Sequence, residues 1–125
     1  MTRSCKKSSS PQDVALPTTY LNDVRFDLRR GEGGIAFITD SADKGPNGIS
    51  VVDLATGERW RRLYEHPSTK AETPPAFMPI VEGQPFFERP ADGAPKPITI
   101  GADRIAIGHD SARLYYLPTR QPPSL

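Results

Sequence analysis

Four strand-length segments follow one another between residues 20 and 63, and this series limits the folds open to the chain. They cover residues 21–27, 34–40, 48–54 and 58–63 and are separated by turns rich in Gly, Asn and Asp. Apolar residues on both faces of the second and third segments predict a sheet covered on both sides. An antiparallel meander of four strands in about 40 residues is the size of one β-propeller blade.

Part of the series returns after residue 100. Segments 101–107 and 113–117 repeat the first two strands, and Asp103 lies 80 residues after Asp23. Residues 64–98 read as a long Pro-rich loop insertion with one short strand pair near residues 78–81 and 84–88. When an insertion of roughly 35 residues is subtracted, the offset between Asp23 and Asp103 falls from 80 to about 45 residues, a plausible blade period. The sequence therefore predicts an all-β chain holding about one and a half blades; a small independent β-domain of six or seven strands is the alternative.

The division of the chain follows from this repeat. We expect a disordered lead-in at residues 1–13, a partial propeller at 14–119 and a tail at 120–125. Within the propeller, the first blade covers 20–63, the insertion 64–98 and the start of the next blade 99–117. Prolines in the tail cannot donate to a strand ladder, so the chain is expected to be a piece of a longer propeller. Unpaired strand edges at the two cut ends could self-associate.

Composition excludes several classes of function. The formal net charge is +1 with mixed signs along the chain, and no sustained basic stripe suggests a nucleic-acid partner. No apolar run approaches the ~18 residues of a membrane span, and no signal peptide is recognisable. The single cysteine, Cys5, lies in a polar run and reads as an exposed thiol.

Several of these segments resemble the major royal jelly protein/yellow family, especially its bacterial and fungal members. The resemblance rests on short segments in the order and spacing of that family: residues 16–27 (LPTTYLNDVRFD), 36–41 (AFITDS), 51–57 (VVDLATG), 60–63 (WRRL), 66–68 (HPS), 81–83 (VEG), 101–107 (GADRIAI) and 114–116 (LYY). It implies a six-bladed β-propeller of which this chain is a middle portion. It also implies an extracellular, secreted protein; family roles include binding of small amines or lipids, pigment-pathway functions and food proteins without catalysis.

A more distant similarity is to the gluconolactonase/regucalcin propellers. That similarity places Asn22 and Asp103 where inner strands aim oxygen ligands at a central divalent metal, Ca²⁺ or Mg²⁺. It makes Asn22, Asp23, Asp103 and Arg104 the expected channel-facing residues. Arg104 stands where the family usually has Gly, and its cation could replace a metal or block it. The alternative for Asn22 and Asp103 is turn capping, in which their side chains bond to nearby backbone.

The remaining polar and aromatic candidates have ordinary structural readings. Asp40 and Ser41 read as the end of a strand rather than a nucleophile pair. We expect surface histidines at His66 and His109 and solvated carboxylates at Glu72 and Glu82. Four aromatic residues on or near strands are expected in the core between blades, with a pocket for an aromatic amine as the alternative: Trp60, Tyr64, Tyr115 and Tyr116.

Three functions follow from these observations. The first is a small-ligand-binding propeller without turnover. The second is a metal-dependent, lactonase-like hydrolase in which the metal polarises a lactone carbonyl. The third is that the 125-residue chain by itself is inert, because it cannot complete a channel. We expect ligand binding for the longer protein and inertness for the isolated chain.

Overall fold

The computed structural model describes residues 14–42, 46–70, 80–97 and 100–118, and every regular element within these ranges is a β-strand. In this described part no helix is long and apolar enough to cross a membrane. The lead-in at residues 1–13, the whole tail at 120–125, Cys5 and Glu72 lie outside the described residues.

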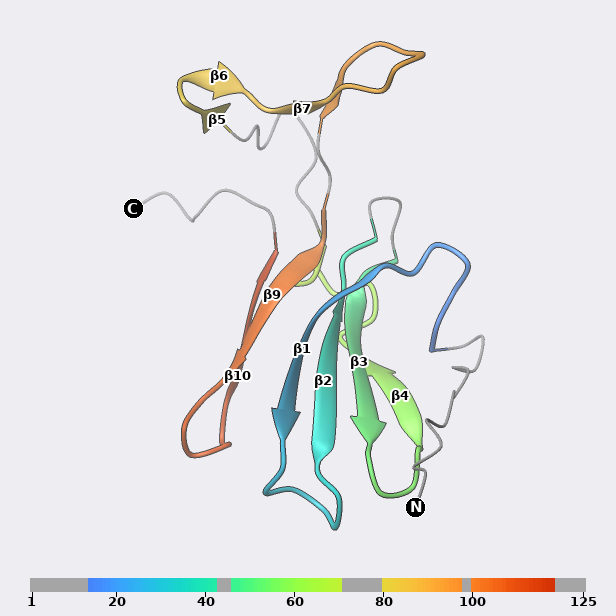
Figure 1. The fold of residues 1–125 in the computed structure, drawn as a ribbon, viewed down its shortest axis with the longest axis vertical. Helices are drawn as coiled ribbons and strands as arrows, with labels where there is room; N and C mark the ends of the chain where they lie inside the picture. Colours follow the sequence, from blue (N-terminus) through green and yellow to red (C-terminus); the bar gives the residue numbers. More distant parts are fainter. Residues whose placement is uncertain (1–13, 43–45, 71–79, 98–99, 119–125) are drawn as a thin grey trace, which may run out of the picture.

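The first four strands form one antiparallel sheet in chain order, β1-β2-β3-β4 (Figure 1). Their bounds are Leu21–Asp27, Ile35–Asp40, Gly48–Asp53 and Arg59–Arg62. The two central strands are mostly buried or half-buried along their length, as expected for a sheet covered on both faces. The predicted meander is therefore confirmed.

Turn chemistry explains why these strands reverse where they do. Gly34 ends the first connection with a φ of 94°, and an added Cβ would lie 2.9 Å from the Leu28 side chain. Gly57 in the third connection has a φ of 77°, and its N–H donates to the Asp53 carbonyl oxygen. Both positions need a backbone conformation that glycine adopts without steric cost.

A second, two-stranded sheet lies against the first. It pairs β9 (Ala102–Ile107) with β10 (Leu114–Pro118). Figure 1 shows β9 beside β1, running in the same direction, as the inner strands of neighbouring blades do. Four buried residues join the two sheets in the core: Ile49, Val51, Ala102 and Ile105, with Phe37, Trp60, Leu114 and Tyr116 packed around them.

Residues 80–97 form two short hairpins above the sheets (Figure 1). The first pairs β5 (Ile80–Val81) with β6 (Gln84–Pro85), close to the predicted strand pair. The second pairs β7 (Phe87–Glu88) with β8 (Lys96–Pro97). The sequence did not predict β8, because a two-residue strand that includes a proline carries no alternating pattern.

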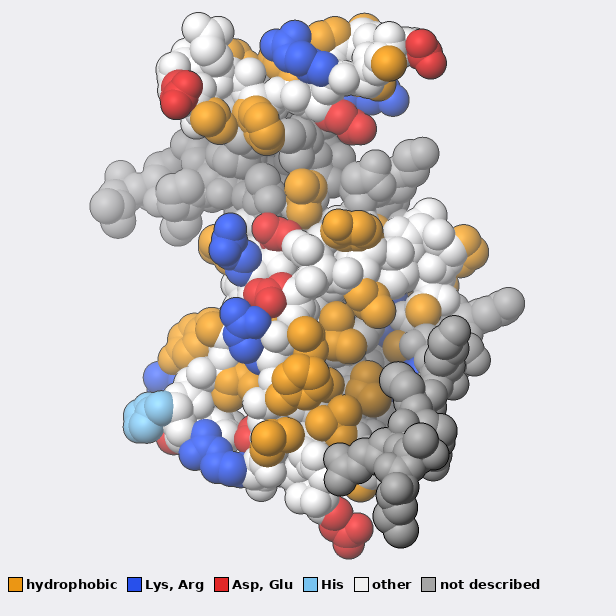
Figure 2. All heavy atoms as spheres, in the orientation of Figure 1, with side chains coloured by type: hydrophobic (Ala, Val, Ile, Leu, Met, Phe, Trp, Pro, Cys, Tyr) orange, Lys and Arg blue, Asp and Glu red, His pale blue; other side chains and the backbone are white. Residues whose placement is uncertain are grey.

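The fold is all-β, with sheets that do not close into a ring within the described residues. It comprises one four-stranded blade and the two inner strands of the next, which is part of a β-propeller. Several large apolar side chains stay exposed, including Phe26 at 57% and Leu117 at 63%. Figure 2 shows apolar side chains gathered over the lower body of the molecule.

Candidate functional site

The same irregularity occurs in both inner strands at the positions of the expected site residues. The register of β1 against β2 shifts between Leu21 and Val24, and that of β9 shifts between Ala102 and Arg104. A β-bulge leaves a residue outside the ladder and turns its side chain. These two bulges contain Asn22 and Asp103. Each side chain is therefore released from the alternating pattern of its strand and can point toward the neighbouring sheet.

Asn22 and Asp103 meet where the inner strands begin. The Asn22 amide Nδ2 donates a hydrogen bond to the Asp103 carboxylate Oδ1. The Asp103 backbone is fixed as well, because its carbonyl oxygen accepts a hydrogen bond of 2.9 Å from the Thr39 hydroxyl in β2. Ser41 makes an adjacent bond of 2.6 Å to the carbonyl oxygen of Ala102. The two blades are therefore held together at this end of the inner strands.

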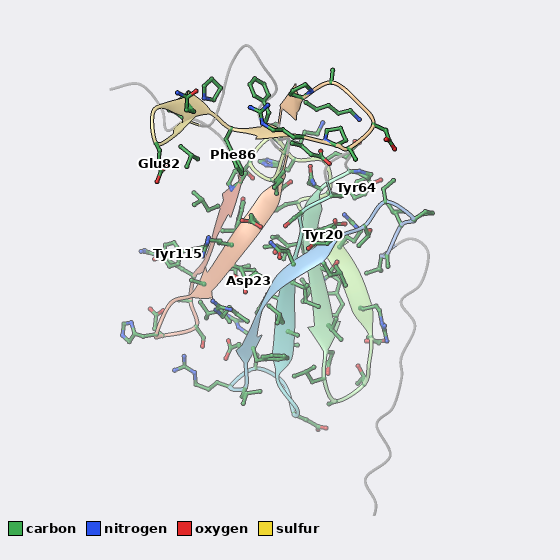
Figure 3. All side chains as sticks on the ribbon, turned by 45° about the horizontal axis from the view of Figure 1, so that its top comes forward. Tyr20, Asp23, Tyr64, Glu82, Phe86 and Tyr115 are labelled. Atoms are coloured by element: carbon green, nitrogen blue, oxygen red, sulfur yellow. The ribbon has the colours of Figure 1, made fainter. Side chains whose placement is uncertain are left out.

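An open cleft of about 730 Å³ lies above this junction. It is bounded by the start of β1, the start of β9 and the hairpin segment, and Figure 3 shows Phe86 pointing from that segment toward the sheets. Its described lining residues are aromatic rings, carboxylates and neutral polar or apolar groups, and none of them is basic: Thr18, Thr19, Tyr20, Asn22, Ser41, Phe86, Phe87, Glu88, Ile100 and Asp103. Such a lining favours a positively charged ligand with an apolar body.

Asp23 points away from this cleft and contacts the neighbouring blade directly. Its Oδ2 accepts a hydrogen bond of 3.1 Å from the Ile105 N–H, and its Oδ1 accepts one of 2.8 Å from Arg25. The Ile105 N–H, helped by Arg25 and the Val24 N–H and opposed by burial, holds the pKa of Asp23 below its ordinary value. Asp23 thus connects β1 to β9.

Arg104 lies on the other side of β9 from Asp103. It lines a separate hollow of about 410 Å³ with Asp23, Arg25 and residues of β10, including Tyr115. The structure therefore brings Asn22 and Asp103 into one cleft, and Asp23 and Arg104 into another.

A buried ion pair next to the cleft was missed by sequence reasoning. Arg61 Nη1 lies 2.9 Å from Asp40 Oδ2, with the two side chains 5% and 0% exposed. Asp40 also accepts hydrogen bonds of 3.0 Å from the Thr19 hydroxyl and the Tyr20 N–H, so it fixes two residues of the cleft wall. The strand-end reading of Asp40 did not foresee this, because its partner is on β4.

At the other end of the inner strands, where β1 ends, the contact between the blades depends on Asp27. Arg29 N–H donates to Asp27 Oδ1 at 3.1 Å, and Arg30 Nε donates to Oδ2 at 2.9 Å. Burial opposes ionisation of Asp27, but these bonds outweigh it and hold its pKa below the ordinary value. The Arg30 guanidinium then reaches across to the carbonyl oxygen of Ser111 in the β9–β10 turn.

Of the other predicted candidates, some lie in the core, some form hydrogen bonds between the blades, and some are exposed on the surface. Trp60 and Tyr116 pack against the core as expected, whereas Tyr64 and Tyr115 are 49% and 55% exposed. Tyr116 also bonds to the Ser68 hydroxyl at 2.6 Å, and Ser68 in turn bonds to His66 Nδ1 at 2.7 Å. His66, His109 and Glu82 are exposed, Glu82 in the β5–β6 turn.

The described residues do not by themselves supply a ligand set for Ca²⁺ or Mg²⁺. Asn22 and Asp103 give two oxygen-bearing side chains, and no group of three His, Cys, Asp or Glu side chains in this part of the chain could hold a metal. Hard divalent cations take six or more oxygen ligands. Any such centre needs ligands beyond these.

The chain has the architecture of a β-propeller protein. The inner strands of two neighbouring blades lie side by side, and a polar cleft lies where these strands begin. The family model described as Major royal jelly protein matches residues 2–122. The chain therefore belongs to the major royal jelly protein family, as the resemblance of its segments predicted. No curated protein and no solved structure gives a significant match to it.

Proposed function

We propose that this chain forms one wall of a small-ligand site in a propeller of the royal jelly/yellow type. The observation that carries the proposal is the cleft above Asn22 and Asp103. Two carboxylates, Asp103 and Glu88, line it together with the rings of Tyr20, Phe86 and Phe87. This combination favours an amine attached to an aromatic or apolar body.

Binding without turnover is the better reading of this cleft. The hydrogen bond between Asn22 and Asp103 occupies the polar groups that would be the first candidates for catalysis. Glu88 comes from a short hairpin at the opposite side of the cleft. Carboxylates and rings placed around a cavity attract and orient a cation, and none of the described lining residues forms a pair of nucleophile and activating base.

For the isolated chain, we expect no catalysis and only weak binding. The sheets of the described residues do not close into a ring, so the cleft is open on one side. An open site leaves more of the ligand in water and loses affinity. The family also supports a place outside the cell, which detection of the protein in the culture medium of its source would test.

Titration of the 125-residue chain with tyramine, followed by NMR chemical shifts, tests the proposal. We expect saturable binding that Asp103→Asn and Glu88→Gln each weaken about fivefold, the effect of losing a partly exposed charge pair. The neutral analogue 4-ethylphenol should bind more weakly, and Glu58→Gln, which removes an exposed carboxylate in the β3–β4 turn, serves as the control. Equal tyramine affinity in all variants would contradict the proposal.

A metal-dependent, lactonase-like hydrolase is the second candidate. The meeting of Asn22 and Asp103 from two inner strands favours it, since the similarity to gluconolactonases places metal ligands there. A chelator separates the two candidates. Under the first, tyramine binding is unchanged by EDTA; under the second, EDTA abolishes lactone hydrolysis, and Asn22→Ala and Asp103→Ala each lower it by orders of magnitude.

A further inference from the structure

The two carboxylates of the cleft come from different elements on opposite sides of it. Asp103 lies at the start of β9, and Glu88 belongs to β7 in the hairpin segment. The cleft lies where the inner strands of the two blades begin, and inner strands line the central channel of a propeller. Both carboxylates therefore lie at an end of the channel, not on a blade face that a further blade would cover.

Asp103 keeps its negative charge and part of its acceptor capacity. Its Oδ1 accepts the hydrogen bond from the Asn22 amide, and its carbonyl oxygen accepts one of 2.9 Å from the Thr39 hydroxyl. A neutral amide donor does not cancel the charge of a carboxylate, and both carboxylate oxygens can accept more than one bond. Asp103 is half-buried and fixed, so it offers a placed negative charge to a ligand.

Glu88 is a second negative charge without a partner. Its side chain is exposed, and it makes no hydrogen bond or ion pair within the residues that the structure describes. Lys96 is opposite Glu88 in the β7–β8 pairing, but no ion pair joins these two described residues. Asp40 next to the cleft differs, because Arg61 neutralises it at 2.9 Å. The described lining of the cleft thus carries two uncompensated negative charges and no basic residue.

A ligand with one cationic group leaves one of these charges unpaired. If the apolar body of the ligand covers the other carboxylate, that group loses water without gaining a partner, which costs free energy. A second cationic group replaces this unfavourable contact with a charge pair. The volume of about 730 Å³ is large enough for a ring with a cationic group at each end.

We propose that the cleft prefers a diamine, in which one ammonium group pairs with Asp103, the other with Glu88, and an apolar or aromatic body lies between them. The exposed rings of Tyr20 and Phe86 offer the surface for that body. This inference rests on the proposed binding of an amine in the cleft and adds the number of cationic groups that the ligand carries.

Two ligands built on the same ring test the preference. At neutral pH p-xylylenediamine carries two ammonium groups, and 4-methylbenzylamine carries one. The 125-residue chain is titrated with each and followed by NMR chemical shifts at low salt, because exposed charge pairs are screened by salt. We expect the diamine to bind about tenfold more tightly: about twofold because either of its ends can bind at Asp103, and about fivefold from the second charge pair.

Variants of the two carboxylates separate these contributions. In Glu88→Gln and in Asp103→Asn the ratio of the two affinities should fall to about twofold, since one charge pair remains in each. Glu58→Gln, which removes an exposed carboxylate in the β3–β4 turn, is the matched control and should keep the ratio of the unaltered chain.

A ratio of about twofold or less in the unaltered chain, or a high ratio that persists in Glu88→Gln, would overturn the diamine preference. Saturable binding of 4-methylbenzylamine in either case would leave the proposed amine site intact. Absence of saturable binding of both ligands would contradict the amine site and the diamine preference together.

Discussion

Asp40 and Arg61 form an ion pair of 2.9 Å inside the first blade, and no more than 5% of either side chain is exposed. Arg61 also donates to the carbonyl oxygen of Val14 at 2.7 Å, which ties the residues before β1 to the outer strand β4. Through Thr19 and Tyr20, Asp40 fixes the wall of the cleft. One buried pair therefore joins the outer strand of the blade to the wall of the cleft.

Removal of one partner of this pair should be strongly destabilising. Arg61→Met leaves the Asp40 carboxylate buried without its cation, and an uncompensated buried charge costs about 3–5 kcal/mol. Arg62→Met on the same strand is the control: Arg62 is exposed above the Trp60 ring, so its loss should cost less than about 1 kcal/mol. Urea unfolding of both variants measures the difference. Similar midpoints for the two variants would contradict a structural role for the ion pair.

The strands could be predicted because their information is local. Alternation and turn glycines within β1 to β4, β9 and β10 fixed their places to within one residue at each end. The repeat of β1 in β9 aligned Asp23 with Asp103, whereas the similarity to the gluconolactonase/regucalcin propellers placed Asn22 and Asp103 at the starts of neighbouring inner strands. The bulges that turn these two side chains carried no sequence signal of their own.

Pairings between distant residues could not be read from the sequence. Asp40 and Arg61 belong to non-adjacent strands, and Asp23 contacts the Ile105 N–H more than 80 residues away. Periodicity says which face a side chain occupies, but not which residue of another blade lies opposite. The sequence also did not predict that Phe86 and Phe87 line the cleft. They lie among prolines in a segment with little regular pattern.

Acid should loosen the contact between the blades. The pKa of Asp23 is lowered chiefly by the Ile105 N–H, from an ordinary value of 3.8. A carboxylate whose pKa is lower when folded stabilises the folded state above the unfolded pKa, and this contribution is lost as the pH falls through the folded pKa. Melting temperature measured from pH 6 to pH 2 should therefore decline below about pH 4. Asp23→Asn should be less stable at pH 6 and show a shallower decline; an unchanged pH profile in this variant would count against the Asp23 contact.

Gly101 is required by a close approach to Asn47. An added Cβ would lie 2.2 Å from the Asn47 side-chain carbon, and Asn47 is held by bonds to the carbonyl oxygens of Asp40 and Ala42. Gly101→Ala should cost about 1–3 kcal/mol, as overpacking usually does. Thermal unfolding of Gly101→Ala, Asn47→Ala and the double variant checks this. Because the clash requires both side chains, the double variant should be more stable than the sum of the two single effects implies; simple additivity would show that no clash exists.

Loss of the hydroxyl group should affect stability at one of the two neighbouring tyrosines of β10 and hardly at the other. Tyr116 bonds through its hydroxyl to Ser68 at 2.6 Å and so connects the second blade to the loop after β4. Tyr116→Phe should therefore lower the free energy of unfolding by about 1 kcal/mol. Tyr115 is 55% exposed on the opposite face, so Tyr115→Phe should change stability by less than about 0.5 kcal/mol. Chemical unfolding of the pair compares the two faces of one strand directly, and a larger effect at Tyr115 would reverse the assigned orientation of β10.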